Sequence, residues 1–183
     1  MMKRQMRKRR ITFLTIVSLI VIGSIGLVGC GRSKKEDVKA DECVIVVEEV
    51  AEEKDYIIDI PLSCELQEEL HEACEEFGVD YYTMIALIEK ETDFTNKLGD
   101  SGESYGYCQI QPKWWYGLMV EIDATDLTVP KDNFRTACAI VAQLTEKYQS
   151  LEGALVAYNQ GQYKGCSTNY SREIIENAKR YRA

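Results

Sequence analysis

The sequence contains only one histidine, His71, and no Cys-x-x-Cys pair. Zinc sites in proteins are built from several Cys and His ligands at short, regular spacings. No set of ligands with this spacing is found along the chain. The sequence therefore predicts no metal centre, and nothing in it indicates a cofactor.

Basic residues are scarce after the first ten positions. The whole chain has 22 Lys and Arg residues against 30 Asp and Glu residues, and six of the basic ones lie within residues 1–30, which contain no acid. The remainder keeps 16 basic and 30 acidic residues, a net charge of −14. Binding to a phosphate backbone requires a basic surface. The composition therefore excludes nucleic acid as a partner.

Residues 1–30 have the pattern of an export signal. Six cations precede an uncharged run over residues 11–29, and a basic region before an apolar one is typical of a secretory signal. The run ends in Leu-Val-Gly-Cys30, which resembles the lipobox of bacterial lipoproteins and implies lipidation of Cys30. Alternatively, the run stays uncut as a signal anchor, because its 19 residues can span a bilayer as a helix. Both alternatives predict a membrane-anchored protein whose remainder lies outside the cytoplasm.

Residues 31–60 are predicted to form a flexible linker. Their first part is polar and charged, and the part over 41–54 is acidic. Such a composition cannot bury a core. A Val-Ile-Val-Val patch at 44–47 could form a strand, but no partner strand is indicated nearby.

From residue 61 onward the apolar residues recur at helical spacing. The five predicted helices share this pattern and begin after Ser63, near Asp80, after Pro130, at Leu151 and after Ser171. Gly78 and Gly161 are expected to end the first and the fourth, and residues 98–106, rich in Gly and Ser, predict a loop. The sequence therefore predicts one compact all-α domain over residues 61–183.

Six cysteines follow Cys30, and an even number in an exported chain permits disulfides. Cys64 and Cys74 fall on one predicted helix, about 15 Å apart at 1.5 Å per residue. A disulfide needs Cα atoms within about 7 Å, so these two cannot pair. The pairing of the others stays open, and buried free thiols are the alternative.

One acidic residue lies on the apolar face of the second predicted helix. Met84, Ile88 and Glu91 stand at i, i+4 and i+7, whereas Glu89 falls on the opposite, solvent side. Burial disfavours the charged form of a carboxyl group and raises its pKa, which suits a general acid that works near neutral pH. Alternatively, Glu91 only ends the helix and pairs with a cation such as Lys97.

Three short motifs begin at this glutamate and follow in order: Glu91-Thr-Asp-Phe94, Gly106-Tyr-Cys-Gln-Ile-Gln-Pro112 and Ala157-Tyr-Asn-Gln-Gly161. They resemble the Glu-Ser-x-Phe, Gly-Leu-Met-Gln-x-x-Pro and Ala-Tyr-Asn-x-Gly elements of the lytic transglycosylase (SLT) domain family, which is related to goose-type lysozyme. The resemblance covers residues 62–182. It implies a lysozyme-like fold and cleavage of the β-1,4 bond between N-acetylmuramic acid and N-acetylglucosamine in peptidoglycan.

Position by position, the resemblance implies roles for five residues. Glu91 would be the catalytic acid and later the base, Gln109 would bind the glycan, and Gly106 would let the backbone approach a sugar. Tyr158 would reach Glu91 and help to hold its carboxyl group, and Asn159 would line the cleft. Plainer roles are the alternative: a core tyrosine bonded to backbone for Tyr158, and hydrogen bonds within loops for Gln109 and Asn159.

Asp100 departs from the family pattern, because many members have Ser at this position, nine residues after the glutamate. It places a second carboxylate near the site. Trp114, Trp115 and Tyr116 follow the second motif, and we expect one of the three to contact a sugar.

The resemblance favours a lytic transglycosylase, in which one carboxyl group suffices and the product carries a 1,6-anhydro-N-acetylmuramic end. Two alternatives stay open. One is a muramidase that hydrolyses the same bond with the help of Asp100, and the other is a wall-binding lipoprotein without turnover. Peptidoglycan strands and the membrane are the expected partners in each case.

Overall fold

The computed structural model describes residues 54–183, which form six α-helices and one antiparallel sheet of two short strands. In chain order the elements are α1 (Cys64–Phe77), α2 (Tyr81–Thr92), β1 (Leu98–Gly99), the 3-10 turn η1 (Asp100–Gly102), β2 (Ser104–Tyr105), α3 (Pro112–Glu121), α4 (Pro130–Tyr148), α5 (Leu151–Gln160) and α6 (Asn169–Arg182). The prediction of a helical domain is confirmed.

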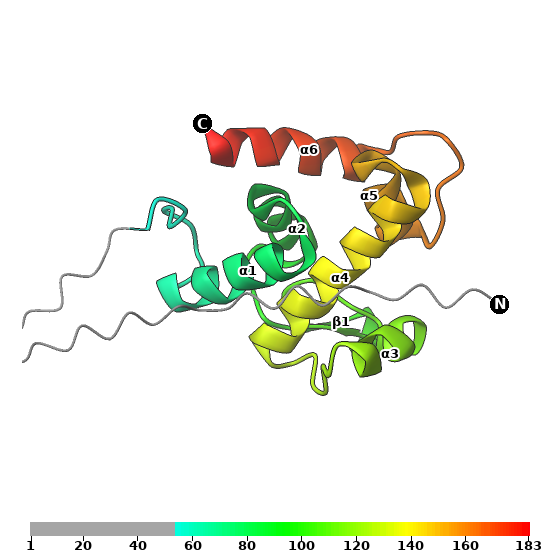
Figure 1. The fold of residues 1–183 in the computed structure, drawn as a ribbon, viewed down its shortest axis with the longest axis horizontal. Helices are drawn as coiled ribbons and strands as arrows, with labels where there is room; N and C mark the ends of the chain where they lie inside the picture. Colours follow the sequence, from blue (N-terminus) through cyan, green and yellow to red (C-terminus); the bar gives the residue numbers. More distant parts are fainter. Residues whose placement is uncertain (1–53) are drawn as a thin grey trace, which may run out of the picture. The chain divides into compact units, whose positions relative to one another are not determined.

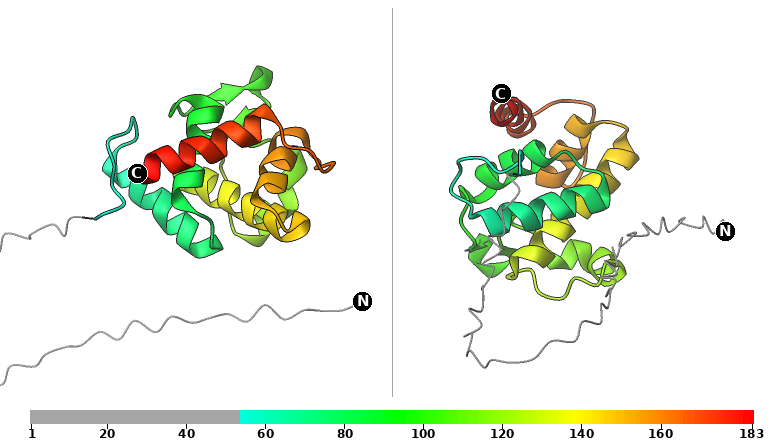
Figure 2. Two further views of the ribbon diagram at one scale, coloured as in Figure 1. Left: turned by 90° about the horizontal axis from the view of Figure 1, so that it is seen from above. Right: turned by 60° about the vertical axis from the view of Figure 1, so that its left-hand side comes forward.

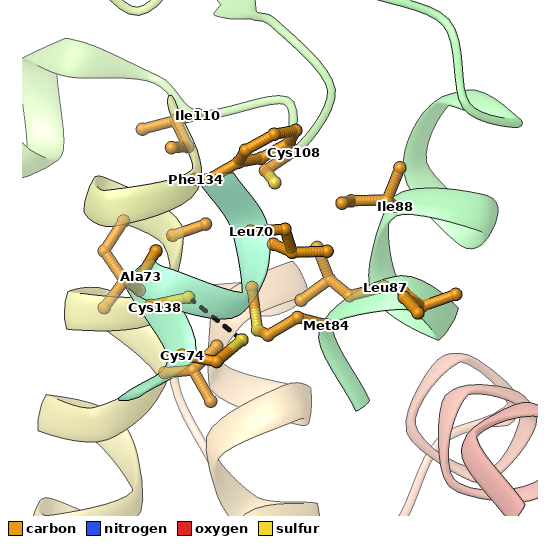
Figure 3. Close-up of a cluster of buried hydrophobic side chains, with 14 of the residues drawn as sticks. Leu70, Ala73, Cys74, Met84, Leu87, Ile88, Cys108, Ile110, Phe134 and Cys138 are labelled. Atoms are coloured by element: carbon orange, nitrogen blue, oxygen red, sulfur yellow. Dashed lines mark hydrogen bonds between the residues drawn. The ribbon is translucent and has the colours of Figure 1, made fainter. Parts of the chain in front are cut away.

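The longest helix, α4, packs against α1, α5 and α3, while α6 lies along α2 (Figures 1 and 2). Figure 3 shows the core between these helices, to which α1 contributes Leu70 and Cys74, α2 contributes Met84, and α4 contributes Phe134 and Cys138. All five side chains are almost completely excluded from solvent. This removal of apolar surface from water is the main force that holds the helices together.

The boundaries of three helices agree with those predicted from the sequence. The side chains of Ser63 and Asp80 accept backbone N–H groups in the first turns of α1 and α2. Helices α1 and α5 end at Gly78 and Gly161, whose φ angles of 67° and 76° are left-handed and favour glycine.

Three details of the helical prediction are corrected. Helix α3 is absent from the prediction, because its apolar residues surround the helix instead of recurring on one face, and only Met119 is buried in the structure. Helix α6 begins at Asn169 with Thr168 as its N-cap, and Ser171 forms a capping box with that threonine instead of starting the helix. Residues 98–106 are not an irregular loop throughout, since β1 and β2 pair within them.

The predicted linker, residues 31–60, is wrong at its C-terminal end. The described part of this segment packs on the domain: the backbone N–H and C=O of Ile58 each bond to the side chain of Gln67 at 3.0 Å. The ring of Tyr56 stacks on His71 with centroids 3.8 Å apart. The folded domain therefore begins before residue 61.

Three predictions lie outside the described residues: the signal or anchor at 1–30, the lipidation of Cys30 and the possible strand at 44–47. Between residues 54 and 183, no helix has the length and apolar character needed to cross a bilayer.

The cysteines of the described region carry free thiols. Cys64 and Cys166 are exposed, whereas Cys74, Cys108 and Cys138 are buried. The sulfur atoms of Cys74 and Cys138 lie 3.8 Å apart (dashed line in Figure 3). Contact with Cys74 and burial together raise the pKa of Cys138, and burial raises that of Cys108. The three buried thiols therefore act as small apolar core residues.

Candidate active site

A cleft of about 800 Å³ opens at the C-terminal end of α2. Its walls come from α2, the β1–β2 hairpin, the segment after the hairpin, α3, α4 and α5. The cleft brings together five of the residues expected from the sequence: Glu91, Asp100, Gln109, Tyr158 and Asn159. Its volume lies within the range of about 300–1,000 Å³ that is usual for ligand sites.

Glu91 lies in the last turn of α2, where it is partly buried. Burial raises the pKa of its carboxyl group, a hydrogen bond from the Tyr170 hydroxyl to Oε1 at 2.5 Å lowers it, and the negative charge of Asp100 raises it again. The net shift is upward. The partner of the Glu91 carboxyl group is Tyr170 and not Lys97, whose ammonium group donates to the backbone carbonyl of Thr92 at 3.5 Å. Glu91 thus combines a raised pKa with a fixed orientation, which a general acid needs.

The tyrosine that holds Glu91 is not the one expected. The hydroxyl of Tyr158 donates to the backbone carbonyl of Cys108 at 2.8 Å and so ties α5 to the second motif. Tyr170, in the first turn of α6, makes the bond to Glu91 instead. No sequence signal marked Tyr170, because it belongs to none of the three motifs. Tyr158 takes the plainer role of a tyrosine bonded to backbone, although it still lines the cleft.

Glu89 is not on an open solvent face, and this expectation is corrected. Its carboxylate accepts hydrogen bonds from Arg180 and Asn177 of α6, each at 2.9 Å, and only 25% of its side chain is exposed. Glu89 therefore joins α2 to α6, and it does not line the cleft.

The second motif is held in place by Asn133 of α4, which is completely buried. Its Oδ1 accepts the Cys108 N–H at 2.9 Å, and its Nδ2 donates to the carbonyls of Tyr105 and Leu127 at 2.9 and 3.0 Å. A Cβ atom at Gly106 would lie 2.2 Å from this Nδ2, and the φ of 75° there also favours glycine. Gly106 thus makes room for Asn133. It does not line the cleft, contrary to the expectation that it lets the backbone approach a sugar.

Gln109 is fixed by the backbone around it. Its Nε2 donates to the carbonyls of Lys97 and Gly106 at 3.1 and 2.9 Å. Its Oε1 lies 1.9 Å from the place that a Cβ atom at Gly99 would take, so the glycine is needed for this approach. The amide nitrogen therefore holds the loop by hydrogen bonds, which is the alternative role named above for Gln109. The side chain also lines the cleft.

Asp100 is exposed and has a left-handed φ of 47° in η1. Its Oδ2 accepts hydrogen bonds from Ser104 Oγ at 2.6 Å and from Gln111 Nε2 at 3.1 Å. The carboxylate is therefore held in one position within the cleft that also contains Glu91. Asn159 lies exposed near the C-terminal end of α5 and lines the same cleft.

Comparisons with known proteins identify the family. The family model for the transglycosylase SLT domain matches residues 69–177, more than half of the chain. The chain belongs to the transglycosylase SLT domain family. The solved structure of an inactive mutant of lytic transglycosylase Slt from Pseudomonas aeruginosa is similar in fold, with a TM-score of 0.56 and 16% identity over 67% of this chain and 24% of that one. None of the curated protein sequences matches the chain.

This SLT domain has the lysozyme-like helical fold that the resemblance implied. The chain spans about a quarter of the length of the Slt chain that it matches. The family match includes both Glu91 and Tyr170. Among residues 54–183, no three His, Cys, Asp or Glu side chains are placed to hold a metal ion together.

Proposed function

We propose that this SLT domain cuts the glycan strands of peptidoglycan as a lytic transglycosylase, with Glu91 as its only catalytic carboxyl group. The observation that carries the proposal is the position of Glu91, partly buried in a cleft with a raised pKa. Membership of the family supports the substrate class, and so does the fold shared with a lytic transglycosylase.

The first step is proton donation to the glycosidic oxygen. Tyr170 donates its own hydrogen bond to Oε1 of Glu91, so Oε2 is the atom that carries the acidic proton. When this proton moves to the bridging oxygen, the bond from C1 of N-acetylmuramic acid to that oxygen breaks. The N-acetylglucosamine unit then leaves with a free 4-hydroxyl group.

The second step closes a ring in the substrate. The carboxylate of Glu91 takes the proton of the C6 hydroxyl, whose oxygen bonds to C1 of the same sugar. A 1,6-anhydro end forms without water, and Glu91 recovers its proton. Burial favours both steps, because it keeps the acid protonated at the start and makes the carboxylate a stronger base afterwards.

Asp100 favours one second candidate, a muramidase that hydrolyses the same bond. Its carboxylate lines the cleft with Glu91, and its charge acts on the pKa of Glu91. Two carboxyl groups that flank a glycosidic bond can divide the roles of acid and base, with water as the second reactant. Hydrolysis would leave a reducing N-acetylmuramic end.

Mass analysis of the muropeptides released from purified cell wall separates the two candidates. The anhydro product is lighter than the reducing product by one water molecule. We expect anhydro ends from the wild-type chain and from Asp100→Ser. Reducing ends that disappear in Asp100→Ser would overturn the transglycosylase in favour of the muramidase, and no soluble product from the wild-type chain would overturn both.

Glu91→Gln and Glu89→Gln form a matched pair for the role of the acid. The amide at position 91 has the same size but no acidic proton, so we expect no cleavage and an unchanged fold. The amide at position 89 weakens the ion pair with Arg180, so we expect some loss of stability and full cleavage per folded molecule. Equal losses of cleavage in the two variants would remove Glu91 from the mechanism.

We also propose that the chain acts outside the cytoplasm while anchored to the membrane, by a lipid on Cys30 or by an uncut signal anchor. Extraction of the protein from membranes and measurement of its intact mass distinguishes the two. Acyl mass on a shortened chain, lost in Cys30→Ala, supports the lipid, whereas an unchanged full-length mass supports the anchor.

A further inference from the structure

Two aromatic residues of α3 are similarly exposed but differ in their relation to the cleft. Trp114 is 72% exposed and Tyr116 is 70% exposed. Trp114 lines the same cleft as Glu91, whereas Tyr116 does not. The neighbouring Trp115 is partly buried and packs against the core. Exposure of a single apolar side chain is common and carries no meaning alone, but Trp114 combines its exposure with a position in the wall of the cleft.

The exposed indole of Trp114 is held in a fixed orientation. Its Nε1–H donates to Oε1 of Gln111 at 3.2 Å, and Nε2 of Gln111 donates to Asp100 at 3.1 Å and to Ser104 at 3.2 Å. An indole N–H can only donate and a carboxylate can only accept, so these partners determine which way the amide of Gln111 points. A network that begins at Asp100 thus sets the orientation of the Trp114 ring.

The surroundings of the Trp114 ring leave space for a sugar. The ammonium group of Lys113 lies 5.6 Å from the ring centroid and is ion-paired with Glu103. The high exposure of Trp114 leaves ring surface open toward solvent. The axial C–H groups of a pyranose ring form a flat apolar patch that fits an aromatic face, while the hydroxyl groups around its edge stay hydrated.

We propose that Trp114 is a stacking platform for one sugar ring of the glycan strand, and that Gln111 is the positioning residue that fixes the ring. A side chain that is already oriented loses little conformational freedom when the ligand binds, which favours affinity. The proposal rests on the proposed function for the identity of the glycan. It adds a subsite in the wall of the cleft that α3 forms.

Binding without turnover tests the platform directly. Glu91→Gln removes cleavage. The chain has two tryptophans, so Trp115→Phe leaves Trp114 as the only one. Titration of this full-length protein with the β-1,4-linked tetramer of N-acetylglucosamine should change the emission of Trp114 in a saturable way. An emission that does not respond at saturating tetramer would overturn the proposal.

Matched variants in the Glu91→Gln background locate the contact by calorimetry. We expect Trp114→Ala to weaken binding of the tetramer about tenfold, the effect of about 1.4 kcal/mol, and Tyr116→Ala to leave it unchanged. Equal affinities of these two variants would refute the platform. Gln111→Met should weaken binding less and should lower the fluorescence anisotropy of Trp114 in the free protein, since the ring is released. An unchanged anisotropy would remove Gln111 from its positioning role.

The failure of this proposal is distinguishable from failure of the proposed function. Muropeptide release by the chain with Glu91 intact tests cleavage alone. If the chain cleaves the wall but Trp114→Ala does not weaken binding of the tetramer, the proposed function stands and the platform is refuted. A chain that binds the tetramer through Trp114 but releases no muropeptide keeps the platform and loses the enzyme.

Discussion

Replacing Asn133 by Leu should test whether the second motif depends on a single buried amide. Leu has a similar size but makes no hydrogen bonds, so the Cys108 N–H and the Leu127 carbonyl lose their partner. The Tyr105 carbonyl keeps its bond from the Ile110 N–H at 3.0 Å. Each unpaired buried group costs about 1–3 kcal/mol, so the variant should lose about 2–6 kcal/mol of unfolding free energy.

This loss is large compared with the roughly 5–15 kcal/mol that stabilises a typical domain. A loss of 1 kcal/mol lowers the Tm of a domain of this size by about 2–6 °C, so we expect a decrease on the order of 10 °C. The variant should remain mostly folded at 25 °C. Its cleavage per folded molecule should nevertheless fall, because the segment that carries Cys108 and Gln109 is no longer fixed beside the cleft.

Thr136→Val is the matched control on the same helix. Thr136 is also completely buried, but its hydroxyl bonds to the Asp132 carbonyl within α4, at 2.6 Å. We expect Thr136→Val to lose less than about 1.5 kcal/mol of unfolding free energy, the value of one hydrogen bond, and to keep full activity. Thermal unfolding and muropeptide release measure both effects. If Asn133→Leu matched Thr136→Val in both assays, the reasoning about the buried amide would be refuted.

Three further predictions follow from the contacts of Glu91 and of the N-terminal segment. Because the acid must be protonated, the alkaline limit of activity should move to higher pH in Tyr170→Phe and to lower pH in Asp100→Asn; shifts in the same direction would contradict the assignment. Folding raises the pKa of Glu91 above its usual 4.5, so the wild-type chain loses stability as the pH rises from 4.5 to the pKa in the folded state. Urea unfolding should therefore show that Glu91→Gln is more stable than the wild type above this pH range and not below it. A chain that lacks residues 1–60 should unfold more easily than one that lacks residues 1–53, by roughly 1–3 kcal/mol, the value of two hydrogen bonds; identical urea midpoints would show that the intervening residues contribute nothing.

The sequence was informative where local periodicity decides the structure. Glu91 could be predicted to lie on a partly buried face, because helical spacing determines the direction of a side chain within its own helix. The helix ends at Gly78 and Gly161 could be predicted for the same local reason, since few residues other than glycine adopt a left-handed φ easily. The prediction of a linker was wrong at its C-terminal end, because the acidic composition over 41–54 does not continue to Tyr56 and Ile58. The apolar side chains of these two residues pack on the domain.

Residues whose role depends on contacts between distant segments could not be predicted. Tyr170 bonds to Glu91 across 79 positions, and Asn133 bonds to Cys108 across 25. Neither residue lies in a motif, and neither interrupts the periodicity of its own helix. For the same reason the sequence could not show that the bond to Glu91 comes from Tyr170 and not from Tyr158. Motif spacing indicates that a residue lies near the cleft, but the partner of its hydroxyl group depends on how α5 and α6 pack.

The groups around Glu91 act on its pKa in opposite directions, and this balance suits the proposed reaction. Burial raises the pKa of the carboxyl group and the charge of Asp100 adds to this, while the bond from Tyr170 lowers it without cancelling the rise. A glycan that fills the cleft displaces water, which strengthens the effect of burial and keeps the acid protonated until the substrate is in place. After proton transfer, the same loss of water leaves a carboxylate that takes a proton from the C6 hydroxyl more readily, while Tyr170 holds it in position. The acid and the base of the two steps can therefore be one residue, provided that its surroundings stay closed to solvent through the first step.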